Sequence, residues 1–387
     1  MLNYMRKSLK ISKKQIQKDN HISHATFRRA EVTDFVGHNE ILNTLAKYFN
    51  IDVNYDTKII AEVNDNFNCF YTALYFGQLD KLELYYHKIE AKKALYSNSI
   101  LFSVYHFARL IYYISSPLRV ETETILDSLE VLRYFQEDLL EEFSFLLEEY
   151  TYCYYSLIHD EKQALSLAKK VYLEGHKYPR LLPLVLYQMS VNYYFINDYA
   201  NSIFYSLEAL PLLESDLNYT RAIFCHSNNS ICFERLNNTV KSKEILEKIF
   251  LYLTINENKR LEFLARLTLA NCYVTEENYL EAVELFKELE SQNEVKGESS
   301  LMILFCYYKS GNIESFNLLK NELELALNED KFYKGYFDLV LFMDAIMKKD
   351  KKQIAQRFSI AEKSFSYYSD SKIVELIYKE AKNKKII

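Results

Sequence analysis

The side chains best suited to binding chemistry are the basic ones at the start of the chain. Residues 1–31 contain eight basic and two acidic side chains, a net charge of +6. The remaining residues contain 39 basic and 51 acidic side chains, a net charge of −12. A basic head on an acidic body predicts that the head alone meets a polyanion. The basic residues are Arg6, Lys7, Lys10, Lys13, Lys14, Lys18, Arg28 and Arg29.

A second candidate set consists of carboxamides that recur about every forty residues. Asn192, Asn228, Asn229 and Asn271 lie in the first helix of three successive predicted helix pairs. A carboxamide both donates and accepts, so it can hold a peptide backbone. With the residues expected to frame them, the candidate peptide-binding set is Gln188, Asn192, Tyr194, Asn228, Asn229, Arg266 and Asn271.

The alternative is that these side chains are ordinary polar residues or hydrogen-bond between helices of the array. The peptide interpretation predicts that Asn228→Ala lowers peptide affinity without lowering thermal stability. A loss of stability alone would favour the alternative.

Catalytic and metal-binding patterns are absent from the sequence. There is no phosphate-binding loop, no His-Glu-x-x-His and no nucleophile elbow, and the eight histidines are dispersed. The six cysteines never form Cys-x-x-Cys, so we expect reduced, buried thiols. Paired acids such as Glu141-Glu142 and Glu148-Glu149 are expected on solvated helix faces. We therefore expect neither an enzyme nor a bound metal or cofactor.

The composition predicts an all-α fold. Only 6 glycines and 4 prolines occur in 387 residues, whereas sheet-rich folds need many tight turns. No run of about 18 apolar residues is present, so no membrane span is expected. The N-terminus lacks the apolar core of a signal peptide, and we therefore expect a cytoplasmic protein.

The basic head is predicted to be a small helical domain. Ser12 is a plausible N-cap for a helix over 13–18 with Ile16 inward, and Ser23 for a helix over 24–31 with Phe27 and Ala30 inward. A short helix over 2–8 precedes them. A helix over 39–49, apolar at Ile41, Leu42, Leu45 and Tyr48 or Phe49, would close the core. Two short helices joined by a polar turn form a helix-turn-helix.

The run MRKSLKISKKQIQKDNHISHATFRRAE resembles the repressor-type helix-turn-helix domain, over roughly residues 2–55. The resemblance implies that Lys13 contacts phosphate and that His24, Ala25 and Arg29 read base edges. Thr26 and Arg28 would face phosphate or the turn. These chemistries are suitable, because Arg binds guanine and Ala contacts the thymine methyl.

The long acidic body is predicted to be a repeat array. Residues 183–210 resemble the tetratricopeptide consensus, and similar patterns follow at intervals of about forty residues and again around Gly311. Weaker copies precede them, near Tyr75 and Tyr155. A last pair over 337–368 leads to a capping helix over 373–382. Small residues at Ser190, Ser230, Ala270 and Ala282 would let paired helices approach closely, and stacking would form a right-handed superhelix with a concave surface.

We therefore expect a helix-turn-helix domain over residues 1–56 and a tetratricopeptide-like domain over 57–387. This architecture resembles the peptide-pheromone receptor regulators of the Rgg, PlcR and PrgX type from Gram-positive bacteria and their phages. The resemblance implies a homodimer that binds a palindromic operator and a short peptide. Two alternatives remain: an array that binds a protein partner, and a scaffold or response-regulator binder whose head no longer binds DNA.

Overall fold

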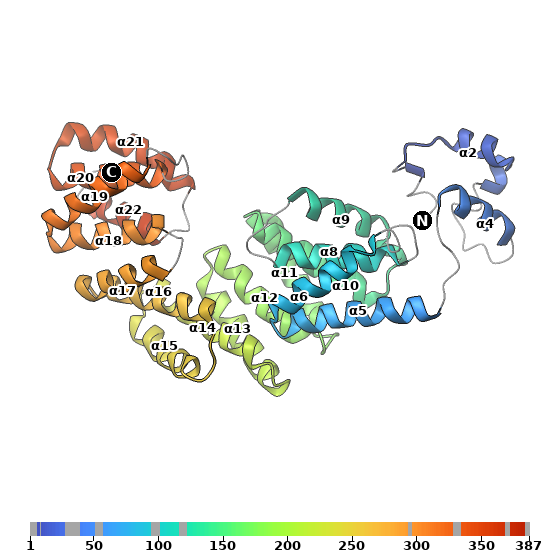
Figure 1. The fold of residues 1–387 in the computed structure, drawn as a ribbon, viewed down its shortest axis with the longest axis horizontal. Helices are drawn as coiled ribbons and strands as arrows, with labels where there is room; N and C mark the ends of the chain where they lie inside the picture. The colour runs from blue at the N-terminus through green and yellow to red at the C-terminus, as the bar shows by residue number, and fades with distance from the viewer. Residues whose placement is uncertain are drawn as a thin grey trace. The chain divides into compact units, whose positions relative to one another are not determined.

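The computed structural model describes residues 6–7, 9–27, 39–50, 57–93, 101–115, 122–292, 296–327, 334–367 and 372–383. Throughout these ranges the secondary structure is helical (Figure 1), as predicted from the scarcity of glycine and proline. The chain divides into two compact units. Unit 1 comprises Met1–Gln188 with Ser215–Arg221, and unit 2 comprises Met189–Glu214 with Ala222–Ile387. The boundary predicted at residues 56 and 57 adjoins a segment outside the described residues.

The described part of the head contains two helical segments as far as Phe27, at the positions predicted from sequence. Helix α2 spans Lys13–Asn20, and the Ser12 hydroxyl caps it by accepting from the backbone N–H of Gln15. His21 ends the helix in the left-handed conformation, and a new helical turn begins at His24. The Ser23 hydroxyl accepts from the Thr26 N–H at 3.2 Å. Both predicted N-caps are therefore confirmed.

The head has a core of its own. Helix α4 spans Asn39–Tyr48, as predicted. The buried core residues are Ile16, Phe27, Leu45, Ala46 and Phe49, and Ile41 packs against them. Of the predicted helix over 2–8, only residues 6 and 7 are described. The predicted inward position of Ala30 lies outside the described residues.

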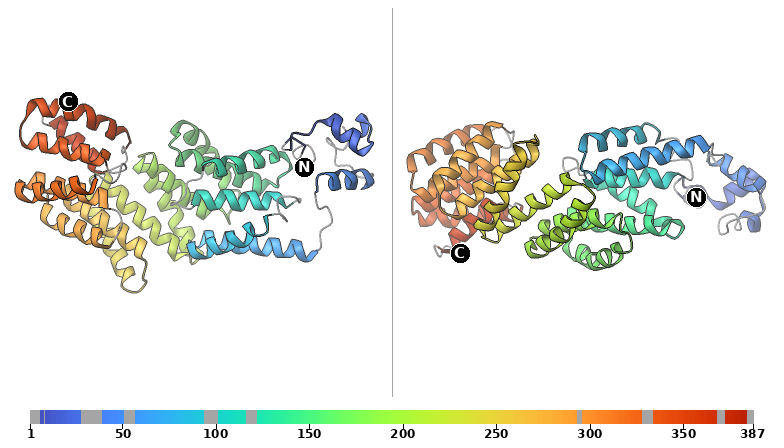
Figure 2. Two further views of the ribbon diagram at one scale, coloured as in Figure 1. Left: turned by 45° about the horizontal axis from the view of Figure 1, so that its top comes forward. Right: turned by 90° about the horizontal axis from the view of Figure 1, so that it is seen from below.

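The body is a succession of helix pairs (Figure 2), and a turn of two or three residues joins the helices in every pair whose connection is described. The earlier pairs are α5 (Thr57–Tyr75) with α6 (Leu79–Glu90), α8 (Phe102–Ser115) with α9 (Thr122–Tyr134), and α10 (Glu141–Leu157) with α11 (Glu161–Gly175). The sequence patterns indicated the first and third of these, whereas the α8–α9 pair was not recognised.

The later pairs follow the forty-residue period. They are α12 (Leu182–Phe195) with α13 (Tyr199–Ser215), α14 (Tyr219–Arg235) with α15 (Thr239–Leu253), α16 (Lys259–Thr275) with α17 (Tyr279–Gln292), α18 (Lys296–Ser310) with α19 (Ile313–Leu327), and α20 (Lys334–Met347) with α21 (Lys351–Tyr367). A final helix, α22, spans Lys372–Asn383. The helices predicted over 183–382 are confirmed.

The turns within the pairs share one backbone feature. Each described two- or three-residue turn holds a residue with φ between 55° and 72°, in the left-handed region. This conformation lets an orphan carbonyl of the first helix be satisfied before the chain reverses. The residues are Gly77, His159, Asn197, Asn237, Glu277, Gly311 and Lys349.

Small residues bring the helices of a pair together, as predicted. Ser190, Ser230, Ala270 and Ala282 have no exposed surface. The Ser242 hydroxyl of α15 donates to the Ser230 carbonyl of α14 at 2.8 Å. A Ser202 hydroxyl donates in the same way to Ser190 in the preceding pair, at 2.7 Å. These bonds satisfy the buried hydroxyls, so the close approach leaves them no unmet hydrogen bond.

The turn after α13 and the first residues of α14 anchor the C-terminal end of α5 within unit 1. The Asn218 amide donates to the Tyr75 carbonyl at 2.7 Å, and the Arg221 guanidinium donates to the carbonyls of Leu74 and Tyr75 at 2.5 and 3.3 Å. The last carbonyls of α5 therefore have side-chain partners in place of a following helical turn.

Candidate functional site

The head presents three of its candidate DNA-binding residues to solvent where the structure describes them. Lys13, His24 and Ala25 are exposed, and Thr26 is partly buried. The Thr26 hydroxyl lies 2.7 Å from the Ser23 hydroxyl, a contact that belongs to the N-cap of this helical turn. Arg28 and Arg29 lie outside the described residues. Lys13 and the first residues of the second helical segment therefore lie at the surface of the head.

Asn228 is bound into the packing between helices. Its amide group donates to the Ser190 hydroxyl at 3.1 Å and to the Ser202 hydroxyl at 2.9 Å. The residue is 9% exposed. Both donated bonds therefore join helix α14 to the preceding pair. This is the alternative interpretation from sequence, in which the carboxamides hydrogen-bond between helices of the array. These bonds now argue that Asn228→Ala lowers stability, in contrast to the expectation from sequence.

Asn229 and Asn271 differ from Asn228, because each buries a carbonyl oxygen that no group among the described residues satisfies. The Oδ1 atoms of both residues lie out of solvent and accept no hydrogen bond. Asn229 is 2% exposed on α14, and Asn271 is partly buried on α16. The Ser227 hydroxyl on α14 is also buried without a partner. A buried, unpaired acceptor costs about 1–3 kcal/mol, so these positions would gain from an N–H donor.

The other candidate peptide residues already have partners within the chain. In unit 1, the Gln188 amide donates to the Tyr150 hydroxyl at 3.2 Å. In unit 2, Arg266 forms ion pairs with Glu262 and Glu288, both at 3.0 Å. Asn192 is buried on α12. Tyr194, on the same helix, is partly buried, and burial raises the pKa of its phenol while the nearby Arg235 guanidinium opposes this.

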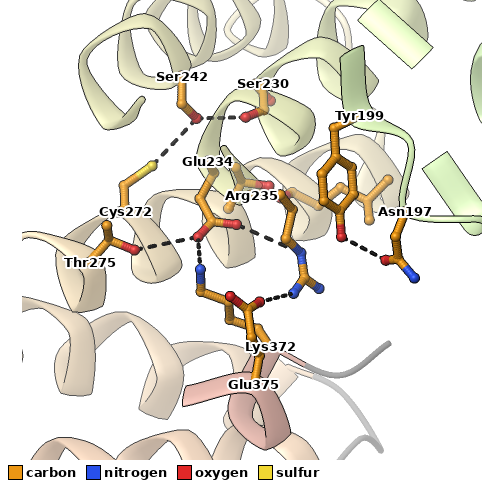
Figure 3. Close-up of polar contacts among 12 residues, drawn as sticks. Asn197, Tyr199, Ser230, Glu234, Arg235, Ser242, Cys272, Thr275, Lys372 and Glu375 are labelled. Atoms are coloured by element: carbon orange, nitrogen blue, oxygen red, sulfur yellow. Dashed lines mark hydrogen bonds and ion pairs between the residues drawn. The ribbon is translucent and has the colours of Figure 1, made fainter. Parts of the chain in front are cut away.

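Unit 2 contains a buried group of charged residues (Figure 3), and one of them, Arg235, hydrogen-bonds to Tyr194. Glu234 is 1% exposed and Lys372 is 3% exposed, and they form an ion pair at 2.9 Å. Arg235 lies 3.9 Å from Glu234 and 3.6 Å from Glu375. The Thr275 hydroxyl donates to Glu234 at 3.5 Å. The sequence analysis missed this group, although Glu234 is a charged residue at the repeat position that Tyr194 and Val274 occupy.

Glu149 corrects the prediction that its acidic pair lies on a solvated helix face. Its side chain is 2% exposed on α10, and Oε1 has no hydrogen-bond partner. Burial disfavours the charged form and raises the pKa of Glu149 to about 8. The neighbouring Glu148 is partly exposed and pairs with Lys170 at 2.6 Å. The prediction failed because position 149 lies on the inner side of α10, between buried positions 146 and 153.

The described residues show no sign of a disulfide, a metal site or a membrane-spanning helix. The cysteines there are free thiols, buried except for the partly buried Cys69, in agreement with the prediction. No three His, Cys, Asp or Glu side chains among the described residues come together as a metal site would require. None of the described helices combines the length and apolar character needed to cross a membrane.

The fold is shared with solved structures of peptide-responsive proteins. The apo form of the quorum sensor NprR from B. thuringiensis matches with a TM-score of 0.64 at 12% identity, over 84% of this chain and 99% of that chain. NprR in complex with its cognate peptide NprX matches with a TM-score of 0.61 at 12% identity, over 86% and 100%. A Rap protein complexed with competence and sporulation factor gives 0.61 at 16% identity, over 84% and 98%.

No protein-family model and no curated protein sequence matches this chain. The similarity therefore lies in the arrangement of helices, at identities of 12% to 16%. The predicted likeness to peptide-receptor regulators is confirmed at the level of the fold: this chain has the tetratricopeptide-like helical architecture of NprR and the Rap proteins.

Proposed function

We propose that this chain is a cytoplasmic, homodimeric transcriptional regulator whose repeat array senses a short signalling peptide. The observation that carries the peptide proposal is the pair of unsatisfied carboxamide oxygens, Asn229 Oδ1 and Asn271 Oδ1, on helices α14 and α16 of successive pairs. A peptide backbone supplies N–H donors at regular intervals, which is the chemistry that these acceptors lack. The fold shared with NprR, which was solved with its peptide NprX, supports the same proposal.

The burial of these oxygens also provides a means of switching. Because both atoms are out of solvent, a peptide reaches them only if neighbouring side chains or helices move apart. Binding therefore favours one arrangement of the array over another, and a ligand shifts an equilibrium only through such differential affinity.

The DNA-binding part of the proposal rests on the basic head. Its helix-turn-helix has two confirmed caps and its own core, and Lys13, His24 and Ala25 are exposed. In this proposal Lys13 and Arg28 contact phosphate, His24, Ala25 and Arg29 read bases, and Thr26 supports the turn. Two heads of a homodimer would occupy the half-sites of a palindromic operator.

The test is genomic footprinting of the tagged protein, followed by gel-shift assays on the bound fragment. The double variant Arg28→Ala, Arg29→Ala is expected to abolish operator binding while the far-ultraviolet circular dichroism stays unchanged. The matched control is Lys169→Ala, Lys170→Ala on the array, which removes the same charge from exposed positions. Equal operator affinity for both double variants would refute the DNA proposal.

Mass spectrometry of molecules that copurify with the chain tests the peptide proposal. A bound peptide of a few residues is the expected result. A stoichiometric protein partner in its place would support the alternative, in which the array is a scaffold.

A further inference from the structure

Helix α22 contacts α18, in the pair before the last, and its polar side chains reach α14, three pairs before the last. Its apolar face, Ile373, Val374, Ile377 and Ala381, belongs to a hydrophobic core that also contains residues of every helix from α16 to α21. A helix that only capped the array would make its polar contacts on the last pair, α20 and α21, whereas those of α22 fall on α14 and α18. Its seat, which we call the α22-binding surface, therefore belongs to the inner part of unit 2.

Polar contacts fix both ends of α22 on this surface. At its first residue, Lys372 pairs with Glu234 of α14 at 2.9 Å, and Glu375 approaches Arg235 at 3.6 Å (Figure 3). Towards its other end, Glu380 accepts from the Tyr308 hydroxyl at 2.9 Å and pairs with Lys309 of α18 at 3.0 Å. The α22-binding surface is thus Glu234 and Arg235 at one end, Tyr308 and Lys309 at the other, and an apolar floor between them.

Ion pairs of this kind are suited to a contact that opens and closes. A buried ion pair contributes little net stability compared with apolar packing, because both charges lose their hydration. It does impose strong selectivity for the charge pattern of the occupant. Glu234 and Lys372 are both nearly inaccessible, so removing Lys372 leaves the buried Glu234 carboxylate with only the Arg235 guanidinium at 3.9 Å and the Thr275 hydroxyl at 3.5 Å.

The surface is also connected to a candidate peptide residue. The Tyr194 phenol interacts with the Arg235 guanidinium, which raises the pKa of Arg235 against the effect of its burial. Arg235 in turn faces both Glu234 and Glu375. A ligand that engages Tyr194 therefore acts on the residues that hold the start of α22.

We propose that α22 is a displaceable internal ligand, and that the α22-binding surface accepts in its place a short peptide with a cationic group at one end and a carboxylate at the other. The peptide's cationic group would replace Lys372 on Glu234, and its carboxylate would replace Glu380 on Tyr308 and Lys309. This proposal rests on the proposed peptide-sensing function, which supplies a short peptide as the ligand.

The dimensions suit a peptide of a few residues. From Lys372 to Glu380 the α-helix rises by about 12 Å. An extended chain covers that distance in about four residues. A free peptide of about five residues, apolar in its middle, therefore places its ammonium and carboxylate groups at the two charged ends of the surface.

The first experiment is native-state hydrogen exchange on the unmodified full chain. Amides of α22 are expected to exchange by a local opening, at least tenfold faster than the buried amides of α16 and α18. Exchange of α22 only together with those helices, in a single global unfolding step, would overturn the proposal. This readout needs neither DNA nor an identified peptide, so it stands apart from the tests of the proposed function.

The second experiment uses a labelled, end-capped peptide with the sequence of residues 372–383 as the probe. The full chain carrying Lys372→Glu is expected to bind this probe at least tenfold more tightly than the unmodified chain, because its own α22 is repelled by Glu234. The matched control is Lys379→Glu, the same charge change on the exposed face of the helix, which should bind like the unmodified chain.

A probe that itself carries Lys372→Glu should fail to bind, whereas one with Lys379→Glu should bind normally. Equal binding of both probes would show that the charged ends do not select the occupant. Loss of helical circular dichroism in the Lys372→Glu chain would show that α22 is an inseparable part of the core. Either result refutes the exchange.

Discussion

The carboxamides of the array differ in what their atoms contact. Asn228 donates two hydrogen bonds to serine hydroxyls of the preceding pair, whereas Asn229 and Asn271 each hold an acceptor without a partner in the described part of the chain. The same side-chain amide thus stabilises the packing at position 228 and leaves a buried oxygen without a hydrogen bond at position 229. Peptide contact and structural support are separable by substitution.

Asn228→Ala is expected to lower the free energy of unfolding by about 1–3 kcal/mol, because the hydroxyls of Ser190 and Ser202 lose a buried donor. Asn271→Ala removes an unsatisfied oxygen, so it should leave the stability unchanged or higher while weakening peptide binding. Chemical denaturation and calorimetric titration with the copurified peptide measure the two quantities. The reverse pattern would assign peptide contact to Asn228.

Glu149 makes the stability depend on pH. Its folded-state pKa of about 8 lies above the ordinary carboxyl value, so the folded chain holds a proton that the unfolded chain releases. Stability should therefore fall as the pH rises from about 4.5 to about 8 and then level off, because above the folded pKa both states are ionised. Tyr150, which is also buried, adds to the cost of a charge at this place.

Glu149→Gln is expected to abolish this decline and to raise the free energy of unfolding at pH 8 by a few kcal/mol, on the order of the shift in pKa. Urea denaturation at several pH values between 5 and 9 measures the effect. Glu148→Gln, at the partly exposed neighbouring position, serves as the comparison. Parallel pH profiles for the unmodified chain and Glu149→Gln would contradict the buried, neutral carboxyl.

At the scale of the elements, the turns within the pairs explain how so few glycines suffice. Left-handed backbone is supplied by glycine at Gly77 and Gly311, by asparagine at Asn197 and Asn237, and by a bulkier residue such as Glu277 elsewhere. A side chain with a Cβ atom pays roughly 1–2 kcal/mol for this conformation. The array therefore carries a small strain at each turn that lacks glycine.

Glu277→Gly is expected to raise the free energy of unfolding by about 1 kcal/mol, because φ is 64° there and the side chain is exposed. The control is Glu281→Gly in the first turn of α17, which should lower it by about 1 kcal/mol, since glycine weakens a helix. Thermal denaturation of both variants gives the comparison. Destabilisation by Glu277→Gly would show that the side chain contributes more than the backbone strain costs.

At the scale of the whole molecule, the charge is divided between the head and the array. The first 31 residues carry +6 and the rest −12, so a nucleic acid is attracted by the head and repelled by the array. This division favours an orientation in which the head alone contacts DNA. The proposed operator binding is therefore expected to be sensitive to salt, since each phosphate contact releases counterions.

Lys13→Ala is expected to weaken binding to all DNA sequences to a similar degree, and to reduce the slope of log affinity against log salt by about 1. His24→Ala should instead relax the preference for one base and leave the salt slope unchanged. Filter-binding or anisotropy titrations at several salt concentrations separate these two behaviours. A change of salt slope with His24→Ala alone would reverse the two assignments.

Local patterns were enough to predict the all-helical fold, the head and most of the helix pairs. Ser12 and Ser23 cap helices by accepting a hydrogen bond from the backbone N–H three residues later, and Phe27 lies four residues after Ser23. The small residues Ser190, Ser230 and Ala270 recur at a fixed period of forty residues. The α8–α9 pair was not predicted, because its first helix is apolar at most positions and the pair departs from the forty-residue period. Such signals are readable from sequence, because hydrogen bonds at caps and the spacing of apolar residues are local properties.

The partners of individual side chains were decided only by the tertiary structure. Lys372 and Glu234 are 138 positions apart, and no local pattern links them. The sequence placed a helix near residues 373–382, but whether it capped the last pair or packed on α18 depended on how the preceding pairs stack. Burial likewise set Glu149 and Glu148 apart, since desolvation and pairing depend on the surroundings of a side chain and not on its type.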